Sequence, residues 1–151
     1  MRNHNRSLAL VFVLCISAVP ALAQEAKVAG RIKVSSGAAF VVRNGTPTPA
    51  QVGQTVLETD GLRTGGDGKV GVTLNDDTRL SLGPNSELKL ERFTYAPADS
   101  RFDLVLKFVK GAATYVSGRI AKLSPDSVRL ETPASIIGVR GTTLAIQVQP
   151  E

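Results

Sequence analysis

Residues that break regular structure are spread through most of this chain. From residue 24 onward it holds all 14 glycines and seven of its eight prolines, about one breaker in every six residues. The breakers separate short runs in which apolar and polar residues alternate. An average helix takes about 11 residues and an average strand only about 5, so this spacing favours strands over helices. We therefore expect an all-β protein.

The alternating runs are typical of strands that bury one face. Between two of them, Asn44-Gly45 suits the positive φ angles of a type I′ turn and predicts a hairpin. The run 101–110 fits both a strand and a helical face. Strict alternation of large apolar residues, with Gly111 after it, favours a strand buried on both sides. The expected strands cover residues 28–35, 38–43, 52–57, 69–74, 79–82, 87–91, 101–110, 112–116, 119–123, 128–132 and 142–149.

The first 23 residues are typical of an export signal. The signal features are basic residues, an apolar run and a small-x-small end: Arg2 and Arg6, Leu8–Ile16, and Ala21-Leu22-Ala23. We predict a helical signal peptide over 1–23, cleavage after Ala23 and a periplasmic or secreted protein. A membrane anchor is disfavoured because the apolar stretch is shorter than about 20 residues and is interrupted by Pro20. A lipoprotein signal ending at Cys15 is disfavoured because Leu14 stands where a small residue is needed.

The composition of residues 24–151 excludes several kinds of chemistry. The only His, Cys and Met are His4, Cys15 and Met1, so beyond the predicted signal the chain lacks imidazole and thiol groups. This excludes Ser-His-Asp and Cys-His catalysis, His- or Cys-ligated metals, and disulfides. Sixteen basic residues against 13 acidic ones give a charge of about +3, which is weak evidence for an anionic partner. Few aromatic residues and an export signal make nucleic-acid binding an unlikely function.

Carboxylates are the remaining catalytic candidates. Asp76 and Asp77 are adjacent, and Glu87 and Glu91 flank Lys89 on one strand face. The first pair is typical of a hairpin tip and the second of a solvated strand surface, so we expect no catalytic residue. A calcium site at Asn75-Asp76-Asp77 or at Asp67 is conceivable, but the spacing matches no full calcium loop, so we expect no metal and no cofactor.

Arg140 is the other residue that stands out, because it lies between Gly138 and Gly141 in an apolar neighbourhood. We expect it to cap strand carbonyls or to pair with a carboxylate, in preference to binding a ligand.

Several stretches, in their order along the chain, resemble the FecR domain. They are Leu62-Arg63-Thr64-Gly65, Asp67-Gly68-Lys69-Val70-Gly71-Val72, Thr78 to Leu88, Lys110-Gly111-Ala112 with Tyr115-Val116, and Thr132-Pro133 with Gly138-Val139-Arg140-Gly141-Thr142. They span about 57–148, within one expected domain over 24–151. Asp76-Asp77-Thr78 departs from the family's frequent Asp-Gly-Thr, and Thr59-Asp60-Gly61 from its frequent Gly-Asp.

The resemblance implies a twisted, solenoid-like or sandwich β fold in the periplasm. In the founding members the domain relays the occupancy of an outer-membrane siderophore transporter to a cytoplasmic sigma factor, through a membrane helix and an anti-sigma segment. We expect neither segment here, and hence no signalling across the inner membrane by this chain alone. The resemblance points to Arg63, Asp67, Arg79, Asn85, Arg140 and Thr142 as structural or partner-binding residues.

Our leading hypothesis is a non-catalytic module that binds an envelope protein or a cell-wall or surface polysaccharide. The alternatives are an assembly component that pairs with other copies through exposed β edges, an accessory sensor subunit of a siderophore-type system and, last, an enzyme that acts on glycans through carboxylates alone.

Overall fold

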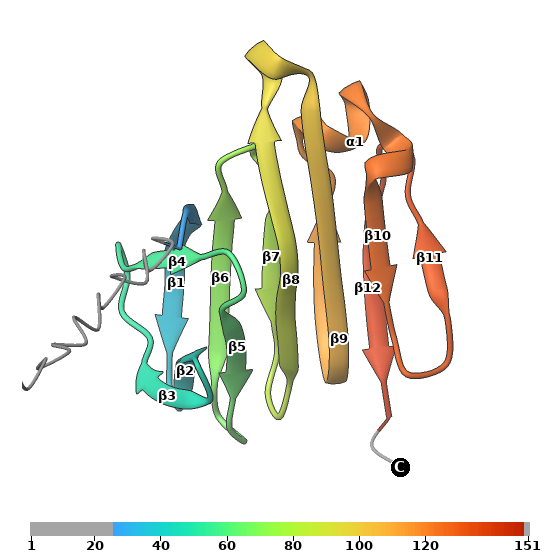
Figure 1. Cartoon of the computed structure of the whole chain (residues 1–151). Coiled ribbons are helices and arrows are strands. Elements are labelled where there is room, and N and C mark those ends of the chain that lie inside the picture. The colour runs from blue at the N-terminus through green and yellow to red at the C-terminus, as the bar shows by residue number, and fades with distance from the viewer. Residues whose placement is uncertain (1–25, 150–151) are drawn as a thin grey trace, which may run out of the picture.

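A computed structural model describes residues 26–149, and most of them lie in strands. The strands form one curled sheet whose neighbours run antiparallel, except that β10 runs parallel to β9 (Figure 1). The all-β, single-domain prediction is confirmed, while the predicted signal peptide lies outside the described residues. The strands are β1 (Val28–Ser36), β2 (Ala39–Arg43), β3 (Thr46–Pro49), β4 (Thr55–Leu57), β5 (Gly61–Thr64), β6 (Lys69–Leu74), β7 (Arg79–Leu82), β8 (Glu87–Ala96), β9 (Arg101–Val116), β10 (Val128–Glu131), β11 (Ile136–Gly138) and β12 (Thr143–Val148).

The curled sheet has two layers that share one long strand. Sheet A contains β4, β1, β6, β7, the second half of β9 and β12, paired in that order. Sheet B contains β3, β2, β5, β8, the first half of β9, β10 and β11. Along one edge of the molecule the chain passes from one layer to the other at four places: between β1 and β2, between β5 and β6, between β7 and β8, and within β9. The architecture is therefore a sandwich of two β layers. It is also solenoid-like, because successive pairs of strands, one from each layer and called rungs below, stack on one another. The fold thus combines the predicted sandwich and solenoid-like forms.

The core lies between the layers and is built from the inward residues of the alternating runs. Its members include Ile32 and Val72 from sheet A and Leu62, Leu104 and Leu106 from sheet B, each at most 2 % exposed. Burying one large aliphatic side chain contributes about 1.5–3 kcal/mol, so this core accounts for most of the driving force for folding. The outward residues of the same strands form the two outer faces of the molecule.

Several local predictions are confirmed. The Asn44-Gly45 hairpin has φ angles of 50° and 79°, as a type I′ turn requires. Residues 101–110 form a strand, and only its middle, Leu104 to Leu106, is buried on both faces.

Other local predictions are wrong. Residues 119–123 form the helix α1 (Arg119–Leu123) and not a strand, because the 76–77 turn binds the free backbone N–H groups at the start of the helix. The expected strand 52–57 is reduced to β4, since Gln51 to Gln54 make a turn. Three strands were not predicted: the Pro-containing β3, the four-residue β5 and the short β11. Two 3₁₀ turns, η1 (Pro97–Asp99) and η2 (Pro125–Ser127), complete the described elements.

Candidate functional site

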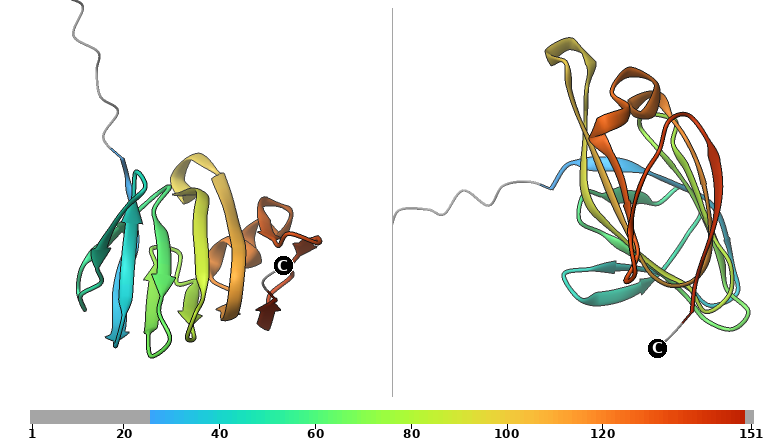
Figure 2. Two further views of the ribbon diagram at one scale, coloured as in Figure 1. Left: turned by 90° about the horizontal axis from the view of Figure 1, so that it is seen from below. Right: turned by 90° about the vertical axis from the view of Figure 1, so that its right-hand side faces the viewer.

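The four layer changes between β1 and β2, between β5 and β6, between β7 and β8 and within β9 lie side by side and form a row of corners. Gly65 N donates a hydrogen bond to Ala38 O at 2.7 Å, and Asn85 N donates to Gly65 O at 2.9 Å. Ala112 N in turn donates to the Ser86 hydroxyl at 3.0 Å, so the bonds connect all four corners. In Figure 1 the β5–β6 and β7–β8 loops both lie at the lower end of the molecule, and the left-hand view of Figure 2 shows the molecule from that side.

Two hydroxyls and one carboxylate secure the row of corners. The Thr64 hydroxyl donates to Gly83 O at 2.6 Å and accepts from Ser86 N at 2.9 Å. Asp67 Oδ1 accepts from Ala38 N at 3.1 Å. Thr64 and Ser86 are at most 4 % exposed, so their hydrogen bonds are shielded from water.

Gly111 is the corner inside β9. Its φ is 84°, and a Cβ atom added there would lie 2.3 Å from the Ser86 hydroxyl, so no other residue fits without displacing its neighbour. The corner segments are the same stretches that carry the family resemblance. Asp67 and Asn85, two of the predicted site residues, therefore belong to the scaffold; Asn85 holds a positive φ of 51° there.

The opposite end of the sandwich is fixed by Asp76. Its carboxylate is fully buried and accepts hydrogen bonds from Thr78 N at 3.1 Å, from the Thr78 hydroxyl at 2.7 Å and from Ile120 N at 3.3 Å. Arg119 N donates to the Asp76 carbonyl at 2.6 Å. The tip of the β6–β7 hairpin is thus bonded to the start of α1. The hairpin prediction is confirmed, but of its two acids only Asp77, with an exposed side chain, is solvated.

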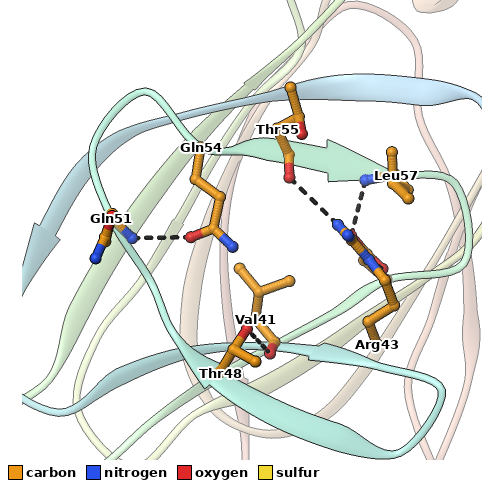
Figure 3. Close-up of polar contacts among 8 residues, drawn as sticks. Val41, Arg43, Thr48, Gln51, Gln54, Thr55 and Leu57 are labelled. Atoms are coloured by element: carbon orange, nitrogen blue, oxygen red, sulfur yellow. Dashed lines mark hydrogen bonds and ion pairs between the residues drawn. The ribbon is translucent and has the colours of Figure 1, made fainter.

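The end of β2 is joined to the turn between β4 and β5 by an ion pair that the sequence did not reveal. Asp60, only 2 % exposed, accepts two hydrogen bonds from Arg43, at 2.9 and 2.8 Å, and a third from Leu57 N at 2.8 Å. The bond with Asp60 raises the pKa of Arg43 above its usual value. Figure 3 shows Arg43 reaching from one layer toward Thr55 and Leu57 of the other. The pair closes this end of the sandwich.

The remaining predicted residues lie far apart on the molecule. Arg63 is on the outer face of sheet B, 3.4 Å from Glu87, and Arg79 is on the outer face of sheet A. Arg140 and Thr142 lie in the loop between β11 and β12. The Ser117 hydroxyl donates to Thr142 O at 2.9 Å and accepts from Thr142 N, so Thr142 is structural.

Arg140 does not play the structural part that we expected. It is exposed, and within residues 26–149 it makes no hydrogen bond or ion pair. The strands on either side of this loop, β11 and β12, pair with their neighbours without any contact from Arg140. The reason is that the Gly138 to Gly141 segment passes outside the core, with only Val139 turned inward.

The acidic candidates do not converge. Glu87 pairs with Arg63, whereas Glu91 is exposed at an irregularity in the β8–β9 register. Asp76 is fully engaged inside the protein, and Asp77 pairs with Arg119 at 2.9 Å. Within residues 26–149 no three acidic, His or Cys side chains gather as metal ligands, and none of the described helices is long and apolar enough to cross a membrane.

The outer faces of the two layers are the remaining surfaces on which a partner could bind. Two depressions lie on sheet A: one of about 380 Å³ is floored by Ser81, Thr114 and Ala145, and one of about 570 Å³ is lined by Arg79 and Lys122. A third, of about 470 Å³, lies over Gly61 on sheet B and is lined by Arg63, Glu87 and Lys89.

The fold and the stacked corners define a small β-sandwich domain with open outer faces. A family model described as FecR protein matches residues 60–151, well over half of the chain. The chain therefore belongs to the FecR family, as its sequence stretches indicated. No curated protein and no solved structure matches it.

Proposed function

We propose that this protein is a non-catalytic binding module of the cell envelope, whose partner is an envelope protein or a cell-wall or surface polysaccharide. One observation carries the proposal: the polar groups of the corners and of Asp76 are bonded inside the scaffold, whereas the charged side chains of both outer faces point to solvent. Such an arrangement suits contact with a partner over a surface and provides no paired acid and base for a reaction.

The predicted export signal and the family support a periplasmic or secreted location. A FecR-type domain is related to sensing and signalling, so an accessory sensor role in a siderophore-type system agrees with the family match. This sensor role is a special case of binding to an envelope protein.

The proposal is tested with the full chain, purified from its exported form. Immobilised protein is exposed to peptidoglycan, surface polysaccharides and detergent-solubilised envelope proteins, and retained material is measured over a concentration series. We expect saturable binding to one of these classes and no release of reducing sugar from any glycan. Absence of saturable binding to all classes, or measurable turnover, would refute the proposal.

A second candidate, assembly through β edges, is favoured by the edge strand β12. Its six residues are Thr-Leu-Ala-Ile-Gln-Val, without a charge or a proline, and in the described residues only its β9 side is paired. The opposite end is protected, since β3 carries two prolines and β4 has only three residues.

This difference between the two ends makes self-pairing in a repeated head-to-tail array unfavourable. An edge partner of β12 would have to be another copy's β12 or a different protein. Sedimentation over a hundredfold concentration range tests self-pairing, and a monomer throughout contradicts it.

A further inference from the structure

The strands of the two layers have the same net charge, but they differ in whether acidic residues are mixed with the basic ones. The strands of sheet A carry four basic residues, Arg31, Lys33, Lys69 and Arg79, and no acidic residue; these four are all exposed. The strands of sheet B carry eight basic residues together with four acidic ones. The net charge of about +3 for residues 24–151 therefore does not reveal that the strands of one outer face carry basic residues alone.

The strand register places these cations at separate points over sheet A. Arg31 lies beside Thr73, and Thr73 lies beside Arg79, so the two arginines are two strand spacings apart, about 10 Å at the backbone. Lys69 is four residues from Thr73 on the same strand and faces the same way, about 13 Å away along the strand. The charges are spread over the face and not clustered at one point.

A shallow track lies among these cations. Gly71, Ser81, Thr114 and Ala145 are paired in register across four strands, so the middle of the face has no large side chain. The two depressions on this face adjoin, because Ser81 lines one and Arg79, two residues earlier on β7, lines the other.

The end of the track near α1 adds further positive charge. Arg119 and Lys122 line the depression beside Arg79. The acidic residue there is Asp77, and it pairs with Arg119 at 2.9 Å. Arg79 and Lys122 make no ion pair within residues 26–149, so both remain able to bind an external anion.

We propose that the outer face of sheet A binds a linear acidic polysaccharide, an inference that rests on the proposed binding function. Carboxylates of the polymer pair with Lys69, Arg79 and Lys122, while the hydroxyls of Ser81 and Thr114 bind sugar hydroxyls along the track. The shallow, small-residue floor allows sugar rings to approach the sheet.

A protein partner fits this face less well. Protein interfaces are anchored by aromatic, Met and other large side chains in packed pockets. The strands of sheet A expose no aromatic residue, and their one aromatic side chain, Tyr115, is fully buried. Val34, at 54 % exposed, is the most exposed large apolar side chain on these strands. Affinity on this face must come mainly from charge and hydrogen bonds.

The test measures binding of the full chain to polygalacturonate by titration calorimetry. Methyl-esterified polygalacturonate, which has the same backbone without its charge, serves as the control polymer. The sheet A variant is Lys69→Gln with Arg79→Gln. The matched variant, Lys89→Gln with Lys107→Gln, removes the same charge from two exposed, neighbouring positions on sheet B. Circular dichroism verifies that both variants are folded.

We expect polygalacturonate to bind in a salt-dependent manner and the methyl ester not to bind. Loss of two exposed charge contacts should weaken binding about five- to tenfold in the sheet A variant and less than about twofold in the sheet B variant. Equal weakening in both variants, or loss only in the sheet B variant, overturns the assignment to sheet A.

Two further results would also overturn it. Polyglutamate that binds as tightly as polygalacturonate, with the same dependence on sheet A, would identify an acidic peptide as the ligand. Absence of polygalacturonate binding, while the wild-type protein is still retained by another envelope component, refutes the inference but leaves the proposed function in place. If no envelope component binds at all, the proposed function fails as well.

Discussion

Replacing Asp76 by Asn tests whether one buried carboxylate holds the helix end of the sandwich together. The matched control is Asp77→Asn, the same chemical change at the adjacent position. Asp76 is fully buried and bonded to three donors, whereas the side chain of Asp77 is 62 % exposed and pairs with an equally exposed Arg119. The two variants alter the net charge equally, so they differ only in the local contacts.

The loss of unfolding free energy expected for Asp76→Asn follows from how the three donors are placed around the carboxylate. Oδ1 of Asp76 accepts from Thr78 N, while Oδ2 accepts from the Thr78 hydroxyl and from Ile120 N. An amide retains one acceptor oxygen, so its NH₂ group must face at least one buried donor. An unsatisfied buried donor costs about 1–3 kcal/mol, and the bonds that remain weaken when the charge is lost. We expect a total loss of about 2–4 kcal/mol.

Urea denaturation followed by circular dichroism measures the difference. With an m-value of about 2 kcal/mol per molar, Asp76→Asn should lower the midpoint by about 1–2 M. Asp77→Asn should move it far less, since exposed ion pairs contribute little. Amide exchange at Ile120 should accelerate only in the Asp76 variant. Equal midpoints for the two variants would show that the carboxylate does not hold the hairpin to α1.

Three other changes follow from the same structure. Gly111→Ala places a Cβ against the Ser86 hydroxyl and should lower the free energy of unfolding in urea by about 3 kcal/mol or more. The control Gly45→Ala, at a position with a similar φ but open space, should lower it by about 1–2 kcal/mol. Equal losses in the two variants would contradict the corner packing. Arg43→Gln removes the bidentate partner of buried Asp60 and should lower the free energy of unfolding by about 1–2 kcal/mol. The loss is smaller than for a fully buried pair because Arg43 is partly exposed. An unchanged urea midpoint would show that the Arg43–Asp60 ion pair is dispensable for stability. Burial raises the pKa of Tyr115, so the contribution of its neutral hydroxyl to folding stability is complete below about pH 10 and is lost as pH rises through the folded-state pKa. Tyr115→Phe should therefore reduce the loss of unfolding free energy measured between about pH 9 and 11. An identical loss in the variant and the wild type would contradict this cause.

The sequence predicted the sheet better than its connections. Alternation along β6, β7 and β8 identified both the strands and their buried faces, because a period of two depends only on local residues. The helix α1 was misassigned because its short alternating run is also compatible with a strand. What decides its conformation is Asp76, which is more than 40 residues away in sequence and close only in the fold.

The candidate surface could not have been predicted from composition. Lys69 and Arg79 are ten residues apart, with acidic residues between them, and only the register of β6 and β7 brings them to one face. In the same way, Arg43 and Asp60 become partners only when sheet B closes against β4. The positions of these charged side chains depend on which distant strands pair, and local sequence patterns do not contain that information.

The position of the family stretches explains why membership in the FecR family leaves the ligand open. The Thr64, Ser86 and Gly111 positions determine how one rung stacks on the next, so a change at any of them disturbs the scaffold. Outward residues such as Ser81 and Arg79 make none of those corner contacts. A domain with the same corners can therefore carry any charge pattern on its outer faces. For this chain, the outward basic residues of sheet A, and not the corner residues, are where a specific ligand should be sought.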